Sequence, residues 1–236
     1  MLNPANEGGS LVRHAVQAVR SHIRENDLKV GDALPGESHF AGTLGVSRAV
    51  MREAFGALAA LRQIDVANGR RARVAAIDGS VMAASLDHAV ATAQISFAEV
   101  WDVRRTVELR IAELAALRRT PAQARNIVSL ADAMADSADD LPRLTAIDIS
   151  LHQAIAEASH NALFNQMVRS YAALMEVAVP QAWDTRTSEE ERISTLERHR
   201  AMARSIADGD PVAAVAAMEA HFDASIQGLI QPDYSL

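Results

Sequence analysis

Four side chains in the second half of the chain have the residue types of a metal site. Asp148 and His152 are four residues apart, so in a helix they lie one above the other on the same face. His199 and His221 follow in two later segments of helical pattern. Three histidines and one carboxylate suit a divalent ion, with zinc the first expectation and nickel, manganese or iron as alternatives. From the spacing alone, a chance pairing of Asp148 with His152 remains the competing interpretation.

The composition narrows this chemistry. The chain contains no cysteine, which removes disulfides, thiolate nucleophiles and thiolate metal ligands. Any metal must therefore be held by histidine and carboxylate side chains.

A second group of side chains, near the N-terminus, has the charge needed to bind a polyanion. Arg48 and Arg52 are one helical turn apart, and Arg70, Arg71 and Arg73 surround an Asn-Gly dipeptide. Residues 1–76 hold ten Lys and Arg against seven Asp and Glu, whereas residues 77–236 hold thirteen against twenty-three. The net charge of −7 therefore hides a basic N-terminal part, which favours nucleic acid as its partner. A solvated hairpin tip is the alternative for the second arginine cluster.

The residues around these arginines predict a winged helix-turn-helix over residues 1–76. Helical patterns cover about 10–26, 37–44 and 47–61, and Gly45 and Val46 separate the last two. Ser47 is a good N-cap for the third helix. Asn68-Gly69, flanked by Ile64, Val66 and Val74, predicts a β-hairpin wing with a type I′ turn.

The remainder of the chain predicts an all-α antiparallel helical bundle over residues 81–229, after a linker at 77–80 and before a tail at 230–236. Ser96-x-x-Glu99 and Ser188-x-x-Glu191 are capping boxes, and Thr120-Pro121 and Asp210-Pro211 are helix starts. Six or seven helices are expected, at about 80–93, 97–119, 121–138, 141–159, 161–179, 188–207 and 211–229.

The length and hydropathy complete the class assignment. With 236 residues and 49% hydrophobic residues, the chain is expected to form two folded domains. It has no run of about 18 apolar residues and no export signal, so we expect a cytoplasmic protein without a membrane partner.

The N-terminal motifs resemble the GntR family of transcription regulators. The resemblance lies in Leu34-Pro35-Gly36-Glu37 and in the segment from Leu44 to Ala54. It implies that the helix opening with Ser47 is the recognition helix, which enters the major groove of DNA, where arginine can read guanine. Ser38 stands where the family commonly has arginine, so one ionic contact is lost. The DNA-contacting residues are then expected to be Ser38, Ser47, Arg48, Ala49, Arg52, Asn68, Gly69, Arg70, Arg71 and Arg73.

The C-terminal motifs resemble the FCD domain, the effector domain of the FadR subfamily of GntR regulators. The resemblance lies in residues 148–152, 158–163, 199–202 and 217–221. In the metal-binding branch it implies that Asp148, His152, His199 and His221 are the metal ligands. It also implies that Arg104 points into the effector cavity. Arg105, Asn161, Arg169 and Trp183 are weaker candidates for the wall of that cavity. A surface salt bridge between Arg104 and Glu108 is the alternative for Arg104.

Together these features predict a transcriptional regulator, most simply a repressor, and not an enzyme. A homodimer would bind a palindromic operator in double-stranded DNA, and a small organic acid entering the metal-containing pocket would change the placement of the two DNA-reading domains. Three alternatives stay open: a metal-dependent enzyme using the three-His one-Asp site, a purely structural metal, and a fatty acyl ligand. The acyl alternative would bury four polar metal ligands at a cost in free energy.

Overall fold

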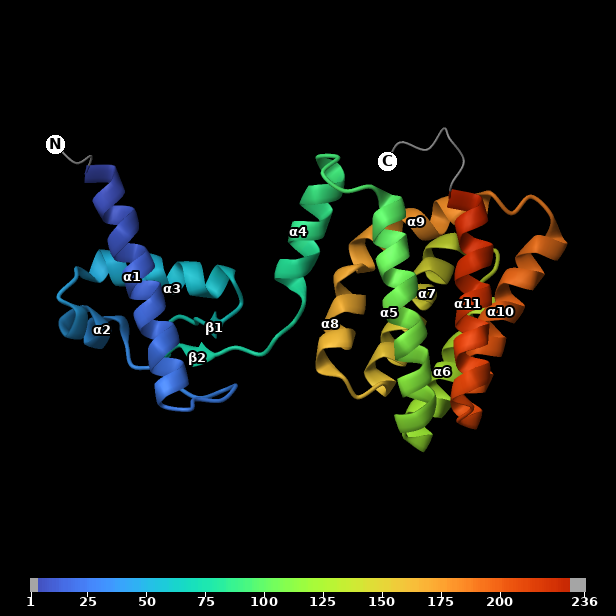
Figure 1. The fold of residues 1–236 in the computed structure, drawn as a ribbon, viewed down its shortest axis with the longest axis horizontal. Helices are drawn as coiled ribbons and strands as arrows, with labels where there is room; N and C mark the ends of the chain where they lie inside the picture. Colours follow the sequence, from blue (N-terminus) through green and yellow to red (C-terminus); the bar gives the residue numbers. More distant parts are fainter. Residues whose placement is uncertain (1–3, 230–236) are drawn as a thin grey trace. The chain divides into compact units, whose positions relative to one another are not determined.

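The computed structural model describes residues 4–229 and divides the chain into two compact units, residues 1–81 and 82–236 (Figure 1). The expected tail at 230–236 lies outside the described residues. Residues 75–79, near the end of the first unit, form no helix or strand, and the next helix begins at Ser80, just before the boundary.

The N-terminal unit has three helices and a two-stranded antiparallel sheet, as predicted. Its elements are α1 (Pro4–Glu25), α2 (Glu37–Leu44), α3 (Arg48–Ala60), β1 (Ile64–Asp65) and β2 (Arg73–Val74). The first helix begins at Pro4, earlier than the predicted residue 10. Its apolar stripe begins only at Val12, and the preceding residues 4–10, Pro-Ala-Asn-Glu-Gly-Gly-Ser, give no periodic signal.

Local chemistry builds the turn between α2 and α3. Gly45 adopts a left-handed conformation with φ 65° at the C-terminus of α2, and its N–H donates to the carbonyl of Ala41. The Ser47 hydroxyl accepts from the Val50 N–H at 3.2 Å and caps α3. The apolar faces of α1, α2 and α3 share one core around Leu34, the buried residues being Ala15, Val19, Leu34, Phe40, Ala41, Met51, Ala54, Phe55, Leu58, Ile64 and Ala72.

The wing differs from its prediction. The strands pair Ile64 with Val74 and Asp65 with Arg73, which leaves a connection of residues 66–72. Gly69 has φ 73°, but Asn68 is not among the residues with positive φ, so the type I′ turn is wrong. The reason is that the last strand pair, Asp65 with Arg73, lies three residues before Asn68 and four after Gly69, which is too far apart for a two-residue turn. An isolated bridge from Ala33 to Arg73 extends the sheet on its other edge.

The C-terminal unit is entirely helical in its described part, which confirms the predicted class. Its helices are α4 (Ser80–Ala91), α5 (Phe97–Arg118), α6 (Pro121–Ala135), α7 (Leu141–Ala158), α8 (Ala162–Ser170), α9 (Ala172–Asp184), α10 (Glu189–Asp208) and α11 (Pro211–Leu229). The capping boxes at Ser96 with Glu99 and at Ser188 with Glu191 are both formed.

One predicted helix, at 161–179, is in fact two. The chain shifts direction at Tyr171, which ends α8 and starts α9, with its N–H bonded to the carbonyl of Val168. Tyr171 has backbone angles in the helical region, φ −86° and ψ −8°, and the apolar residues on both sides of it recur at helical intervals. Periodicity therefore runs through the break and cannot reveal it.

Four helices position the side chains of interest. Helix α5 packs along α11 and against α7, and α10 packs against both α11 and α6 (Figure 1). The α5, α7, α10 and α11 faces that meet contribute a continuous apolar core that includes Ile111, Leu151, Met202 and Phe222. Within the described residues, no helix is long and apolar enough to cross a membrane.

Candidate functional site

Three histidines from three helices converge inside the C-terminal bundle. His152 lies on α7, His199 on α10 and His221 on α11, and all three are buried. Each offers one ring nitrogen, and these nitrogens lie within 4.8 Å of one another. The ring centroids of His199 and His221 are 4.5 Å apart, and those of His152 and His221 are 5.1 Å apart. The fold thus brings together residues that are 47 and 69 positions apart in the chain.

Hydrogen bonds fix which nitrogen of two histidines faces the cluster. The Nδ1 of His199 lies 2.8 Å from the Thr195 carbonyl oxygen, and since a carbonyl only accepts, Nδ1 carries the proton. The Nδ1 of His152 contacts the Glu108 carboxylate in the same manner. Each Nε2 is left as the nitrogen available to a ligand, which is the arrangement that orients metal-binding histidines.

Asp148 completes the cluster on the α7 side. Its Oδ1 lies 3.1 Å from the Nε2 of His199, and it sits one turn before His152. With Nδ1 of His199 already donating, the Nε2 and the carboxylate are two acceptors that face one another. This contact is favourable only if Nε2 of His199 carries a proton or if a cation binds to both Nε2 and the Asp148 carboxylate. Three imidazoles and a carboxylate are a donor set that zinc, nickel or manganese accepts, so these residues fit a divalent ion.

The charges around the cluster keep its carboxylates ionised. Burial acts to raise the pKa of Glu108, but the charges of Arg104 and His152 outweigh it and hold that pKa below its usual range. Burial likewise opposes ionisation of Asp148, and the hydrogen bond with His199 together with nearby positive charge lowers its pKa.

The histidines of the cluster diverge in their proton affinity. Burial acts to lower the pKa of His152, but the adjacent Glu108 carboxylate outweighs this and raises it. Burial, reinforced by positive charge on His199 and His152, lowers the pKa of His221 well below its usual range. His221 therefore stays neutral, with a nitrogen lone pair available to a metal.

Glu108 contacts the histidine cluster, and the sequence interpretation did not place it there. Its Oε1 accepts from Nε of Arg104 at 2.8 Å, and its other oxygen contacts His152, so it links the two. The alternative interpretation of Arg104, a surface salt bridge with Glu108, is correct in its partner but wrong in its place, because both residues are almost fully buried. The available signal was a glutamate within the apolar face formed by Val100, Ile111 and Ala115.

Replacing Glu108 with glutamine is expected to weaken metal binding by roughly 10- to 100-fold, because the oriented, charged partner of His152 is lost. Competition against a chromogenic chelator measures this affinity. Glu113→Gln is the matched control, since Glu113 lies on the same helix but pairs with Arg110 at the surface. Equal zinc affinity of the Glu108→Gln variant and the unmodified chain would contradict the orienting role.

A small cavity opens beside the histidine cluster. Its volume is about 40 Å³, which exceeds the roughly 10–15 Å³ that one water molecule needs. Trp183, expected as a wall residue, lines it, whereas Arg186 was not anticipated. The remaining lining residues are Trp101, Met134, Leu144, Asp148, Ala178, Val179, Ala182, Thr195, His199, His221 and Ser225.

The three residues expected to contact the effector lie elsewhere. The guanidinium of Arg104 is enclosed by the rings of Trp101, Tyr171 and Phe222, with its charge committed to Glu108. Arg104 is therefore placed to position the Glu108–His152 pair instead of lining the cavity.

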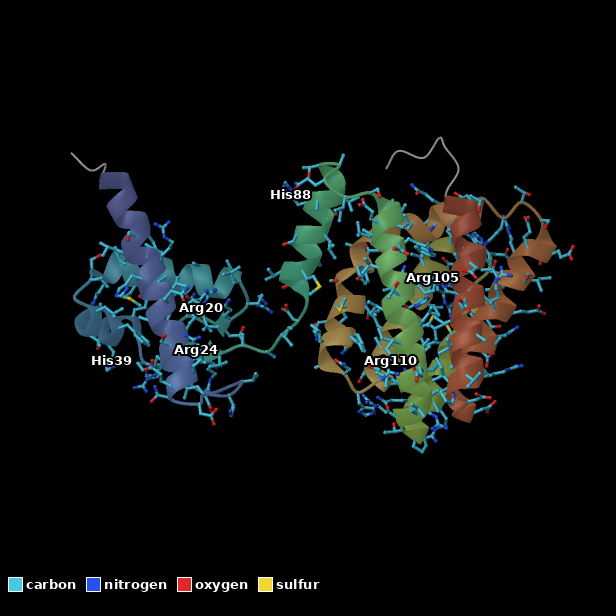
Figure 2. All side chains as sticks on the ribbon, viewed as in Figure 1. Arg20, Arg24, His39, His88, Arg105 and Arg110 are labelled. Carbon is cyan, nitrogen blue, oxygen red and sulfur yellow. The ribbon has the colours of Figure 1, made fainter. Side chains whose placement is uncertain are left out.

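Arg105 and Asn161 have structural roles. Arg105 donates to Glu219 at 2.7 Å and to Asp223 at 3.1 Å, joining α5 to α11 at the surface, and Figure 2 labels it there. The Asn161 side chain accepts from the backbone N–H groups of Leu163 and Phe164 and caps α8. Neither side chain lines the cavity. The prediction was wrong because helix periodicity alone does not tell which polar face turns inward.

The N-terminal unit presents the expected DNA-contacting residues to solvent. All ten are exposed, from Ser38 and the start of α3 to the wing. Among the described residues, Arg48, Arg52, Arg70 and Arg71 form no ion pair or side-chain hydrogen bond, so their charges are unneutralised. Arg73 differs, because its Nη1 donates to the Gly31 carbonyl and holds the wing against the preceding loop.

Comparison with known proteins identifies both units. Residues 11–74 match the family described as bacterial regulatory proteins, gntR family, and residues 99–224 match the FCD domain. A GntR protein of Streptococcus agalactiae has a similar structure, with a TM-score of 0.62 and 25% sequence identity, over 90% of this chain and 97% of that one.

Three curated relatives are regulators as well. The HTH-type transcriptional regulator LutR of Bacillus subtilis is 27% identical over 84% of this chain and 92% of its own length. The galactonate operon transcriptional repressor of Escherichia coli is 29% identical over 76% of this chain and 80% of its own. A proposed regulatory protein of the L-lactate dehydrogenase operon of Escherichia coli is 31% identical over 86% of this chain and 80% of its own. The chain therefore belongs to the GntR family of bacterial regulatory proteins, carries an FCD domain, and is a DNA-binding transcriptional regulator rather than an enzyme.

Proposed function

We propose that this regulator is a repressor whose operator binding is controlled by a small carboxylate effector in a metal-containing pocket. The observation that carries the proposal is the convergence of His152, His199 and His221 with Asp148 beside a cavity in the bundle. The relatives named for galactonate and L-lactate dehydrogenase operons support a sugar acid or short hydroxy acid as the effector class.

DNA recognition is assigned to the start of α3 and to the wing. Arg48 and Arg52 lie one turn apart on an exposed face whose helix begins at the capped Ser47, so its positive end also favours phosphate. Arg70 and Arg71 extend this positive surface from the wing toward flanking phosphates or the minor groove. Ser38, in place of the family's arginine, can still donate a hydrogen bond to phosphate.

The metal would be held by Asp148, His152, His199 and His221. When bound, a divalent ion supplies a Lewis-acidic centre to which an effector carboxylate or hydroxyl can coordinate. Within the chain, Thr195 and Glu108 hold the His199 and His152 rings, and Arg104 holds Glu108. The site is thus organised before any ligand arrives.

Control of DNA binding requires that the effector discriminate between two arrangements of the DNA-reading units. In a homodimer on a palindromic operator, the two recognition helices must match half-sites about 34–36 Å apart, so a change in their spacing weakens binding. By linkage, an effector that lowers operator affinity must itself bind the operator complex more weakly.

The experiment is an operator titration of the zinc-loaded and the chelated full chain, with D-galactonate or L-lactate present or absent. The operator is first obtained by selection from random DNA. One of these acids is expected to lower operator affinity by about 5- to 150-fold for the zinc-loaded chain only. Operator affinity that neither acid alters in either form would contradict the proposed effector class.

A further inference from the structure

Arg186 is a buried cation in the wall of the cavity, and it forms no ion pair with any carboxylate of the described residues. It lies between the end of α9 and the start of α10, and 9% of its surface is exposed. Its backbone N–H donates to the Trp183 carbonyl at 3.0 Å, and its side-chain Nε donates to the Thr195 hydroxyl at 2.9 Å. These bonds fix the guanidinium in the cavity wall.

No carboxylate neutralises Arg186 in the described part of the chain. Among the described residues its side chain forms one hydrogen bond, through Nε, so the two terminal amino groups, which carry four of the five N–H donors, have no acceptor there. Arg104 differs in this respect, since that more deeply buried arginine is paired with Glu108. A buried charge without a partner costs free energy, and such groups are retained where a ligand supplies the partner.

The surroundings of Arg186 add positive charge and a second unused donor. Arg198 also donates to the Thr195 hydroxyl, at 3.1 Å, which brings a second guanidinium to the same side chain. Burial and the charge of Arg198 lower the pKa of Arg186, although Asp148 and Glu191 act to raise it. The indole Nε1 of Trp101, which lines the same cavity, is buried and has no acceptor.

These groups call for an anionic acceptor with more than one oxygen. Asp148 is already engaged with His199, and the Thr195 hydroxyl donates to the Glu191 carbonyl at 2.9 Å. A planar guanidinium with two free amino groups matches a carboxylate in bidentate geometry.

We propose that Arg186 binds the carboxylate of the effector in the cavity that adjoins the histidine cluster. The indole N–H of Trp101 donates to the same carboxylate or to a hydroxyl group of the effector. This inference rests on the proposed effector pocket and moves the anion-binding role from Arg104 to Arg186. It makes Arg186 a specificity-determining residue that selects acids over their uncharged analogues.

Acetate is the simplest probe of such a carboxylate site. Thermal unfolding of the zinc-loaded and the chelated full chain is followed while acetate replaces chloride at constant ionic strength, with acetamide as the uncharged counterpart. Acetate, but not acetamide, is expected to raise the Tm of the unmodified chain in both forms. Absence of an acetate effect in both forms would overturn the inference.

The variant Arg186→Met removes the charge at similar length. Its apparent dissociation constant for acetate is expected to rise at least tenfold, while its Tm without carboxylate equals or exceeds that of the unmodified chain. Arg110→Met is the control, because Arg110 is exposed on α5 and pairs with Glu113 (Figure 2). An acetate response of Arg186→Met equal to that of the control would overturn the inference, as would a lower Tm with unchanged acetate affinity.

Arg186→Lys keeps the proposal testable if the methionine variant fails to fold. It retains the charge without the planar fork, so a partial acetate response is expected, and a response equal to that of the unmodified chain would contradict bidentate binding. Failure of the proposed function appears separately, as an operator affinity that no acid alters although acetate still stabilises the protein through Arg186.

Discussion

Replacing Arg52 with alanine is expected to weaken operator binding by about 1 to 3 kcal/mol, or roughly 5- to 150-fold, without changing the metal content. Arg52 lies on the exposed face of α3 and has no side-chain partner among the described residues, so its guanidinium N–H groups are free to donate to DNA. Fluorescence polarisation with the selected operator measures the affinity. Arg48→Ala, one turn earlier, is expected to act in the same range.

Arg62→Ala is the matched control for this prediction. Arg62 belongs to the same unit, but its Nε donates to Asp78 at 2.6 Å and its charge is already neutralised. Unchanged operator affinity in both α3 variants would remove the recognition-helix assignment. A double variant of Arg70 and Arg71 tests the wing, since the loss of two phosphate contacts per protomer should flatten the salt dependence of binding by about 0.9 per contact in a plot of log affinity against log salt.

Zinc is expected to stabilise the unmodified chain strongly and the His199→Ala variant very little. A ligand that binds only the folded state adds about 4 kcal/mol to the free energy of unfolding at a concentration of one thousand dissociation constants. The ring of His199 lies 4.5 Å from that of His221, and its Nε2 lies 3.1 Å from Oδ1 of Asp148. Thermal unfolding with saturating zinc and with chelator measures the difference in each variant.

His88→Ala serves as the control for that measurement, because His88 is exposed on α4 (Figure 2). It should retain the full zinc effect. If His199→Ala were stabilised by zinc as strongly as the control, the histidine cluster would not be where the metal binds.

Local rules were sufficient for the elements that carry their own signals. The turn between α2 and α3 follows from Gly45 and Ser47, whose left-handed and capping conformations are decided by neighbouring residues. The wing turn at Asn68-Gly69 and the break at Tyr171 were misjudged, because strand pairing and helix packing decide them and the dipeptide or the periodicity does not.

The site was predictable only in part for the same reason. Asp148 and His152 are visible as a pair on one helix face, but the convergence of His199 and His221 was inferred from the family resemblance. Glu108 and Arg186 were missed because their proposed roles depend on the tertiary structure. Glu108 contacts a histidine 44 residues away, and Arg186 donates to Thr195 but forms no ion pair among the described residues. Composition and spacing carry neither kind of information.

Elemental analysis of the purified full chain, after chelation, reloading with zinc and removal of free ion, tests the central claim most directly. The cluster of Asp148, His152, His199 and His221 predicts about one zinc ion per chain, and less than a tenth of that in His199→Ala under the same treatment. A chain that retains no zinc, or a His199→Ala variant that retains as much as the unmodified protein, would contradict the account of a metal-dependent sensor.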